Sequence, residues 1–395
     1  MDATAQPAAP DTQRNVRVFG ATSFLNDTAS EMAYWILPAF LISLGAGPDK
    51  LGLIEGIAES VAAAGKLFSG YLTDRVSRRK PIVVFGYALA NIMKPVLAVT
   101  TAWWQVLLVR FADRTAKGVR GSPRDVMVTE SVTSSRVGSA FGLLQAMDSA
   151  GAVVGPLVAF LIVARVGFRG VFWAAAVPGL LSIAVVAWGA RETGKIFQKH
   201  AAEKQAVSAP HLGRRFYYFL FAVTLFSLGN SSDMFLVLRA QSVGIGPHWA
   251  PLLGLVFNVT FTAASWPAGH LSDRYSKYLM AASGYLVFTV VYLVFAVAPS
   301  HAAIWAMMAF YGLFYALTNP VLRALVASVA PEHARGRAFG IYYFTTSIAT
   351  LLASILTGEL WKHFGPAVPF YLSAGLAVIS AGLLMGVPRV RSAET

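Results

Sequence analysis

The sequence predicts an all-α polytopic membrane protein, with twelve transmembrane helices arranged as two pseudo-symmetric six-helix bundles. Of 395 residues, 56% are hydrophobic and 13% are charged, and the mean hydropathy is +0.58. Soluble domains carry about 25% charged residues. Twelve apolar runs are long enough to cross a bilayer, and the two halves of the chain repeat each other. The runs lack the alternation of a membrane β-barrel, so we expect helices.

The expected helices follow one another closely along the chain. They cover residues 17–44, 51–73, 81–101, 104–128, 139–163, 169–189, 216–242, 249–271, 279–298, 302–328, 339–360 and 366–387. Residues 1–14 lack the basic start and cleavage site of a signal peptide, so we expect a disordered cytoplasmic tail. We expect an N-terminal bundle at 15–190, a cytoplasmic linker at 191–214, a C-terminal bundle at 215–388 and a second cytoplasmic tail at 389–395.

The chain repeats itself after 198 or 199 residues. The segment GYLTDRVSR, which starts at Gly70, recurs as GHLSDRYSK from Gly269, and GSAFG from Gly138 recurs as GRAFG from Gly336. Two related six-helix halves with a site between them are typical of transporters.

Lysine and arginine are unevenly distributed among the loops. With the N-terminus in the cytoplasm, nineteen lie on inner segments and four on outer loops, which predicts cytoplasmic termini in a bacterial inner membrane. The net charge of +13 follows mostly from this asymmetry, so it gives no reason to expect nucleic-acid binding. The absence of cysteine excludes disulfides and thiolate metal sites.

The loop between the second and third helices resembles the signature loop of the major facilitator superfamily. It reads Gly70-x-Leu72-x-Asp74-Arg75-x-x-Arg78-Arg79-Lys80, and a degenerate copy follows the eighth helix. The resemblance extends over essentially the whole chain. It implies a secondary transporter rather than an enzyme, working by alternating access as a monomer in the lipid bilayer, without a cofactor.

A glycine motif in the fifth helix, Gly151-x-x-x-Gly155-Pro156, resembles the antiporter motif of proton-coupled exporters. Small residues there permit close helix packing, and the proline permits a kink. With the two loops, it supplies the gating residues that the resemblance implies. These are Gly70, Asp74, Arg75, Arg78, Asp273, Arg274, Gly151, Gly155 and Pro156.

Seven charges lie within the apolar helix 104–128, on an arc of roughly 140°. They are Arg110, Asp113, Arg114, Lys117, Arg120, Arg124 and Asp125. A charge in the hydrocarbon core costs at least about 2.5–3.5 kcal/mol unless it faces water, a partner or a ligand. The stripe therefore predicts a polar interior. Because nine acids at membrane depth accompany nine bases, the stripe is also expected to pair with Asp27, Glu31 and Asp148.

Two adjacent carboxylates on the first helix, Asp27 and Glu31, are the best candidates for proton binding. They stand at i and i+4, so repulsion and burial should make at least one of them take up a proton readily. Arg110 belongs to Leu107-x-x-Arg110, which resembles a second family motif whose arginine is implicated in proton coupling. The predicted proton-coupling residues are Asp27, Glu31, Arg110 and Asp148.

The superfamily resemblance also implies that helices 1, 4, 7 and 10 line a central cavity. Polar and aromatic residues on these helices are the predicted substrate contacts. They are Asn26, Tyr34, Asp113, Arg114, Asn230, Asp233, Tyr315, Asn319 and Arg323.

These features favour proton-coupled export of a small polar or amphipathic solute. One alternative is a divalent-metal exporter that uses acids such as Asp27, Glu31, Asp148 and Asp233, because intramembrane acids mark ion paths. The seven histidines lie in loops or at helix ends, so no soft-metal site is expected. A second alternative is proton-coupled uptake of an organic anion, supported by five bases against two acids on helix 104–128. A non-transporting membrane sensor or scaffold would not need charges inside the bundle. No phosphate-binding loop for ATP is present.

Overall fold

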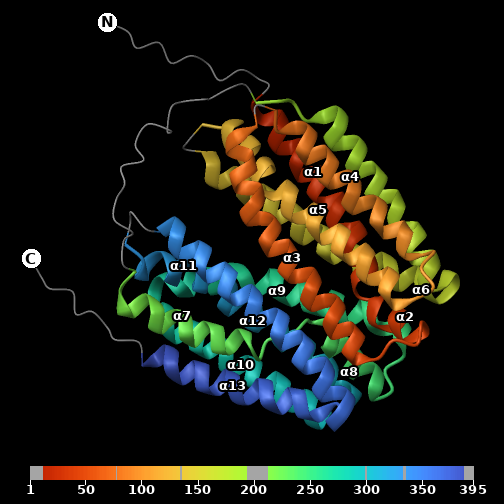
Figure 1. The fold of residues 1–395 in the computed structure, drawn as a ribbon, viewed down its shortest axis with the longest axis vertical. Helices are drawn as coiled ribbons and strands as arrows, with labels where there is room; N and C mark the ends of the chain where they lie inside the picture. The colour runs from red at the N-terminus through yellow and green to blue at the C-terminus, as the bar shows by residue number, and fades with distance from the viewer. Residues whose placement is uncertain are drawn as a thin grey trace, which may run out of the picture. The chain divides into compact units, whose positions relative to one another are not determined.

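The computed structural model describes residues 12–76, 78–133, 136–193, 212–298, 300–331 and 335–386 (Figure 1). Within these ranges every regular element is helical. The elements are α1 (Thr12–Tyr34), α2 (Leu37–Ser43), α3 (Pro48–Arg75), α4 (Lys80–Leu97), α5 (Trp103–Glu130), α6 (Val137–Gly189), α7 (Gly213–Ser227), α8 (Met234–Ser242), the 3₁₀ turn η2 (Pro247–Trp249), α9 (Ala250–Arg274), α10 (Lys277–Val297), α11 (His301–Val329), α12 (Arg335–Phe364) and α13 (Ala367–Met385). The predicted all-α class and the twelve helical spans are confirmed, although two of the spans are each interrupted by a short break.

The fifth and sixth spans form one continuous element, α6. The chain turns between them at Gly167, whose φ of 66° lies in the left-handed region that glycine adopts without strain. This turn falls between the predicted spans 139–163 and 169–189.

Two spans predicted as continuous helices are broken, so the sequence prediction was wrong there. The span 17–44 divides into α1 and α2, because Pro38 has no N–H to donate to the Tyr34 carbonyl. The span 216–242 divides into α7 and α8 across residues 228–233, where Gly-Asn-Ser-Ser has low helix propensity. The Ser232 amide donates instead to Ser354 Oγ at 3.2 Å. The breaks stand at equivalent positions of the two repeats, and broken helices are typical of transporter binding sites.

Contacts divide the chain into two compact units. The first contains α1, the second part of α3, α4, α5 and α6, and the second contains α2, residues 48–63 of α3 and α7 to α13. The boundary predicted at 191–214 lies largely outside the described residues. The bundles at 15–190 and 215–388, like the two tails, stay predictions.

Within the first unit, α6 packs closely against α1 through two glycines. A Cβ at Gly151 would lie 2.5 Å from the Phe24 carbonyl oxygen, and one at Gly155 would lie 2.6 Å from the Thr28 carbonyl oxygen. Real side chains do not tolerate such distances, so only glycine permits this approach of two helices. The motif recognised in the sequence is therefore a packing surface between α1 and α6.

Replacing Gly155 with valine is expected to destabilise the first unit by about 1–3 kcal/mol, the usual cost of overpacking. The added side chain would collide with α1 between Thr28 and Glu31. Thermal unfolding of the detergent-purified protein measures the effect. The control is Gly142→Val in the same helix, where no described atom apart from the local helix backbone lies within 4 Å of a new Cβ. Equal melting temperatures for the two variants would contradict this packing.

The core of the second unit is aromatic. Phe226 stacks on Tyr285 with ring centroids 3.8 Å apart, and the Phe288 ring stacks on Tyr292 at the same distance. Tyr285, Phe288 and Tyr292 are almost completely buried. Stacked and edge-to-face rings of this kind add about 0.5–1.5 kcal/mol per pair beyond burial of their area. The Phe226–Tyr285 pair joins α7 to α10.

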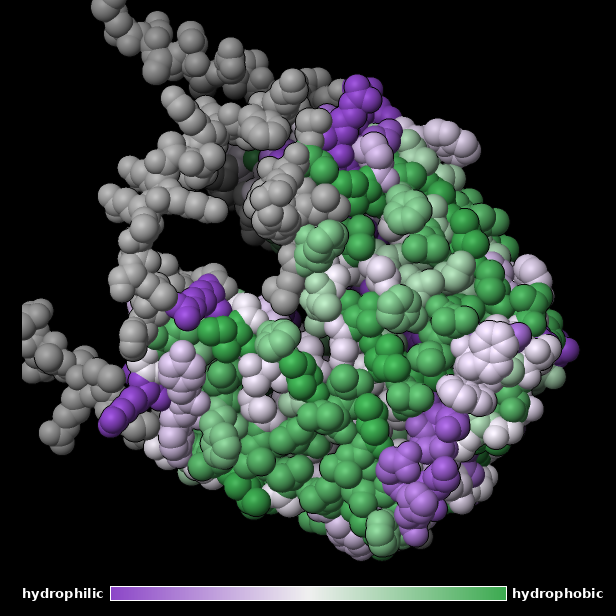
Figure 2. All heavy atoms as spheres, in the orientation of Figure 1, coloured by the Kyte–Doolittle hydropathy of each residue, from purple (hydrophilic) through white to green (hydrophobic). Residues whose placement is uncertain are grey.

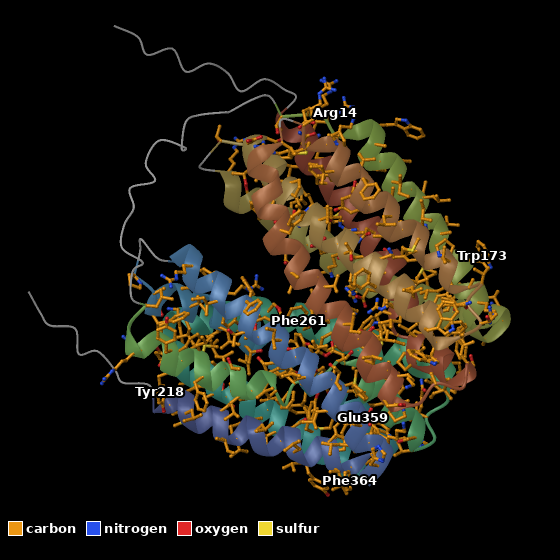
Figure 3. All side chains as sticks on the ribbon, viewed as in Figure 1. Arg14, Trp173, Tyr218, Phe261, Glu359 and Phe364 are labelled. Atoms are coloured by element: carbon orange, nitrogen blue, oxygen red, sulfur yellow. The ribbon has the colours of Figure 1, made fainter. Side chains whose placement is uncertain are left out.

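The face of the molecule drawn in Figure 2 is largely hydrophobic. Large apolar side chains stand exposed, among them Trp188 at 82% and Phe68 at 61%. Trp173 of α6 and Phe364 of α12 point outward in the same way (Figure 3). Soluble monomers rarely expose contiguous apolar surface of this extent. By length and composition alone, α6, α10, α11, α12 and α13 could each cross a membrane. The protein is a multi-pass membrane protein.

An ion pair joins the start of α3 to the end of α12, outside the predicted spans. Lys362 Nζ donates to Asp49 Oδ2 at 2.9 Å, and Lys50 Nζ lies 3.4 Å from the same oxygen. Burial raises the pKa of Asp49, but hydrogen bonds from Lys362 and Lys50 outweigh it and leave the pKa below its ordinary 3.8. The hydrogen bond to Asp49 raises the pKa of Lys362 above 10.5.

These pKa shifts predict a stability profile with two edges. The contribution of Asp49 is complete above about pH 4 and is lost as pH falls through its lowered pKa; that of Lys362 is complete below about pH 10 and is lost above its raised pKa. Asp49→Asn should lower the melting temperature at pH 7, with the difference from wild type vanishing in acid. Glu203→Gln, in the predicted cytoplasmic linker, is the control. A wild-type advantage that persists below the pKa of Asp49 would contradict the assignment.

Candidate functional site

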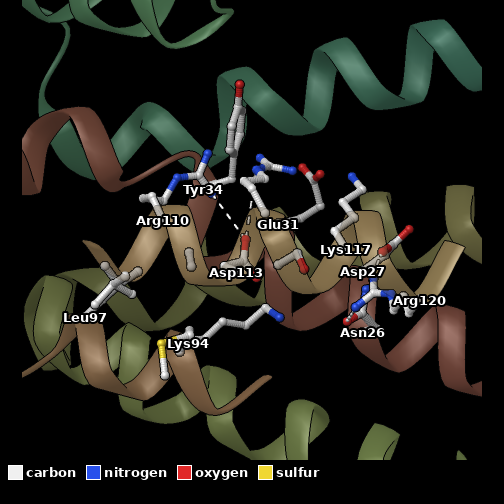
Figure 4. Close-up of a pocket in the computed structure, with 15 residues that line it drawn as sticks. Asn26, Asp27, Glu31, Tyr34, Lys94, Leu97, Arg110, Asp113, Lys117 and Arg120 are labelled. Atoms are coloured by element: carbon white, nitrogen blue, oxygen red, sulfur yellow. Dashed lines mark hydrogen bonds and ion pairs between the residues drawn. The ribbon is translucent and has the colours of Figure 1, made fainter. Parts of the chain in front are cut away.

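A polar cavity of about 100 Å³ lies in the first unit among α1, α4 and α5 (Figure 4). Most of its lining is charged or hydrogen-bonding, although the helices are otherwise apolar. The charged residues are Asp27, Glu31, Lys94, Arg110, Asp113, Arg114, Lys117 and Arg120. The predicted polar interior along residues 104–128 therefore exists.

An amide network holds the inner wall of this cavity. Asn91 Nδ2 donates to Asn26 Oδ1 at 3.2 Å, and Asn26 Nδ2 donates to Asp27 Oδ1 at 2.8 Å. Lys94 Nζ donates to Asn91 Oδ1 at 2.9 Å and to the Ala90 carbonyl at 3.2 Å. Lys94 is only 4% exposed, so its ammonium depends on these acceptors. The network connects α1 with α4 and orients Asp27.

Arg120 joins the network from α5. Its Nη1 donates to Asn26 Oδ1 at 3.4 Å, and its guanidinium lies 4.1 Å above the Tyr87 ring centroid. A Cβ at Gly86 would lie 2.6 Å from Arg120 Cβ, so the glycine lets α4 approach α5 at this point. Arg120 is thus fixed by packing, a hydrogen bond and a cation–π contact.

Asp113 lies between two arginines of its own helix. Its Oδ2 is 3.7 Å from Arg110 Nη1 and 4.0 Å from Arg114 Nε, as the dashed lines in Figure 4 indicate. The Arg110 guanidinium also lies 5.7 Å from the Tyr34 ring centroid. These contacts lie within α5. The predicted pairing of the stripe with Asp148 has support as well, because Asp148 interacts with Arg124 and Lys117.

A second cavity, of about 300 Å³, shares Asn26, Asp27, Lys117 and Arg120 with the first. Asp148 lines it from α6, close enough to Asp27 for the carboxylates to repel each other, and it also interacts with Arg124. Arg124 Nη2 lies 2.9 Å from Asp125 Oδ1. The four residues predicted to couple protons therefore lie on two adjoining cavities of one unit.

In the second unit, the predicted substrate contacts gather around Asp233. Its Oδ1 accepts hydrogen bonds from the hydroxyls of Tyr311 at 2.7 Å and Tyr315 at 3.0 Å. Asn230, in the α7–α8 break, carries a buried side-chain oxygen without a hydrogen bond in the structure. Arg323 is exposed and donates to the Asn319 carbonyl within α11. Tyr315 and Asp233 are brought together, while Arg323 lies two turns further along α11.

A buried acid outside the predicted site also belongs to this region. Glu55 of α3 has no exposed surface, and it accepts a hydrogen bond from Ser232 Oγ at 3.4 Å. Tyr311 and the Asn91–Lys94 pair were likewise not among the predicted site residues. The sequence did contain a signal for these residues, because each is a polar residue inside an apolar span. Such residues usually have a functional role or a polar partner.

The predicted gating residues are described unevenly. Gly70, Asp74 and Arg75 lie in α3, and Asp273 and Arg274 in α9, but their side chains lie outside the described part of the structure. Arg78 is exposed, while Pro156 lies buried in α6 behind Gly155. Their gating function stays a prediction.

The neighbouring Arg79 has well-defined contacts at the end of α5. Its Nη1 donates to both carboxylate oxygens of Glu130 at 2.7 Å. The Glu192 carboxylate accepts hydrogen bonds from the backbone amides of Arg79 and Lys80, each at 3.0 Å, and so caps the start of α4.

Among the described residues, no group of three or more histidine, aspartate or glutamate side chains could hold a metal ion.

The family model of the major facilitator superfamily matches residues 19–239 and 218–395. The chain belongs to this superfamily. An uncharacterised MFS-type transporter of Methanocaldococcus jannaschii is 31% identical over 380 residues, covering 94% of each chain. The resemblance found in the signature loop is confirmed, and the protein is a secondary transporter, not an enzyme.

Two further comparisons concern more distant members of the superfamily. A multidrug resistance efflux pump of Streptococcus pneumoniae is 22% identical, with 88% of this chain and 90% of the pump covered. The crystal structure of a nucleoside transporter matches with a TM-score of 0.81 at 14% identity, covering 95% of this chain and 100% of that one. At such identities the structural match shows the superfamily fold alone.

Proposed function

We propose that this superfamily member exports a small polar or amphipathic solute in exchange for protons, with Asp27 and Glu31 as the proton-binding pair. One observation carries the proposal. The antiporter-like glycines lie directly against these acids: a Cβ at Gly151 would be 3.1 Å from Asp27 Cβ, and one at Gly155 would be 2.8 Å from Glu31 Cβ. The motif that suggests export and the carboxylates that suit proton binding thus form one contact between α1 and α6.

The chemistry of the pair supports exchange. Asp27 and Glu31 line one cavity with Arg110, and Asp148 repels Asp27 from the second cavity. Crowded carboxylates share protons, because ionising all of them costs electrostatic free energy. In the proposed cycle, a proton from outside neutralises an acid as the solute leaves, and it is released inside before the next solute binds. Alternating access of the two halves then carries the solute outward and the proton inward in successive steps.

The proposed setting is a bacterial inner membrane with both termini in the cytoplasm and the protein acting as a monomer. The similarity to a multidrug resistance efflux pump of Streptococcus pneumoniae supports export as the direction of transport. The solutes of that pump are a property of that protein. The other proposed residues are Arg110 and Asp148 for coupling, and the polar side chains around Asp233 for solute binding.

Uptake into inside-out membrane vesicles tests the proposal. Vesicles acidified inside by respiration would be given labelled phenyl phosphate, phenylacetate, benzyltrimethylammonium, phenylacetamide or Mn²⁺. Export in the cell corresponds to accumulation here, and nigericin, which collapses the pH gradient, should abolish it. Accumulation that nigericin leaves unchanged would contradict proton exchange, and accumulation of Mn²⁺ alone would favour the metal exporter.

A further inference from the structure

The break between α7 and α8 frees backbone oxygen atoms inside the second unit. In a continuous helix, the amides of Ser232, Met234 and Phe235 would donate to the carbonyls four positions earlier. Here they donate to Ser354 Oγ, to Ser232 Oγ and to the Ser232 carbonyl. Three carbonyls at the C-terminal end of α7 thereby lose their helical donors, and this end of a helix attracts cations.

Two buried hydroxyls stand beside this break. Ser231 is 4% exposed, and Tyr292 of α10 is 1% exposed. The Tyr292 hydroxyl lies close enough to Ser231, Tyr311 and the Asp233 carboxylate to interact with each of them. Neither it nor Ser231 Oγ makes a hydrogen bond of normal geometry to the part of the chain that the structure describes. Because buried hydroxyls are nearly always paired, two such groups together indicate a water molecule or an ion between them.

Asp233 adds a negative charge to this group of oxygens. The hydroxyls of Tyr311 and Tyr315 donate to its Oδ1 at 2.7 and 3.0 Å. Among the described residues, both hydrogen bonds to this carboxylate reach Oδ1, which leaves Oδ2 for a ligand. We propose that Asp233, Ser231 and Tyr292 bind a sodium ion at the break between α7 and α8.

The charges around Asp233 favour a cation. Glu55 and Glu59 of α3 lie close enough for their carboxylates to repel that of Asp233. The arginines of α8 and α11 do not neutralise it, because Arg239 and Arg323 donate to backbone carbonyls instead. A cation bound to Asp233 would offset this repulsion.

The chemistry of the oxygens favours a small cation with a single charge. Carboxylate, hydroxyl and carbonyl oxygens are the ligands that hard cations prefer. Within the described ranges, no three histidine, aspartate or glutamate side chains come together as a divalent metal site would require. One carboxylate neutralises one charge, and the short reach of Tyr292 to Ser231, Tyr311 and Asp233 suits a small ion. Broken helices of transporters bind coupling ions through such carbonyls and helix ends.

Binding of radioactive sodium to the detergent-purified protein at pH 7 tests the inference, with choline chloride holding the ionic strength constant. We expect saturable binding that unlabelled NaCl displaces and KCl displaces at least tenfold less effectively. The melting temperature should also rise when NaCl replaces choline chloride. Absence of saturable binding would show that the two hydroxyls hold water alone, and it would overturn the inference. Equal displacement by KCl and NaCl would overturn the assignment to sodium.

Variants of the three proposed ligands assign the binding to this break. Asp233→Asn should abolish saturable sodium binding, because it removes the negative charge. Ser231→Ala and Tyr292→Phe should each weaken binding about tenfold or more, as loss of a contact to a charged group does. These two variants each delete a single oxygen atom, so they decide the question even if Asp233→Asn does not fold. Wild-type sodium affinity in both of them would overturn the assignment.

Two control variants make the same substitutions on the same helices. Ser227→Ala removes a buried hydroxyl that donates to the Val223 carbonyl, one turn earlier in α7. Tyr285→Phe removes a buried hydroxyl two turns earlier in α10, which likewise makes no hydrogen bond to the described residues. Both controls should bind sodium with wild-type affinity. If they weaken binding as much as Ser231→Ala and Tyr292→Phe do, the effect is not local to the break and the assignment is wrong.

This inference goes beyond proton exchange at Asp27 and Glu31, because all of the proposed sodium ligands belong to the second unit. The binding assay contains no proton gradient. Sodium binding without gradient-dependent transport would therefore refute proton exchange and leave the sodium site standing. Gradient-dependent transport without sodium binding would do the reverse.

Discussion

Neither Glu31→Gln nor Asp27→Asn is expected to accumulate solute in response to a pH gradient. A gradient of one pH unit supplies about 1.4 kcal/mol per proton, which supports about a tenfold concentration ratio. An amide neither binds nor releases a proton, so each variant should equilibrate solute down its own gradient instead. Inside-out vesicles with and without nigericin provide the measurement.

The two substitutions keep the shape of the side chains, so that packing against Gly151 and Gly155 is preserved. Glu359→Gln serves as the matched control, because this carboxylate is exposed at the end of α12. It should retain full gradient-driven accumulation. If both α1 variants also retain it, the assignment of the proton to Asp27 and Glu31 is wrong.

Asn91→Leu is expected to destabilise the protein by about 1.5–3 kcal/mol, the range for a buried hydrogen bond to a charged group. The substitution removes the acceptor of the Lys94 ammonium and the donor to Asn26. Lys94 would remain buried with the Ala90 carbonyl as its recorded acceptor. Thermal unfolding in detergent measures the loss.

The double variant Asn91→Leu with Lys94→Met tests the cause of this loss. Replacing a buried polar pair by apolar residues of similar volume is often neutral or stabilising, whereas removing one partner is costly. The double variant should therefore be more stable than Asn91→Leu alone. Additive losses from the two substitutions would show that Asn91 acts independently of Lys94.

The fold was accessible from the sequence because membrane spans are set by local composition. Each span must satisfy its own backbone hydrogen bonds, so a long apolar run specifies a helix with few alternatives. The two breaks were missed because hydropathy does not register them. Pro38 lies inside an apolar run, and residues 229–232 form a short polar interval in another. Both depend on single hydrogen bonds rather than on average composition.

The candidate site was predictable in part. Helical periodicity brings the polar residues of α5 onto one face, and the cavity of the first unit contains Asp27, Glu31, Arg110, Asp113 and Arg114 together. Periodicity does not determine how one helix is rotated against another.

The contacts that depend on this rotation were therefore not predicted. They include the Asn91–Asn26 hydrogen bond and the burial of Glu55 beside Ser232. A single sequence contains no pattern that reveals contacts between residues far apart along the chain.

Proton movement driven by solute tests the central claim most directly. Purified protein would be reconstituted into liposomes that contain a pH-sensitive dye and are loaded with the probe showing nigericin-sensitive accumulation in vesicles, with equal pH on both sides at the start. Proton exchange predicts that outward flow of this probe acidifies the interior in wild type and does not do so in Glu31→Gln. Outward flow of the probe with no change of internal pH in the wild-type protein would contradict the account.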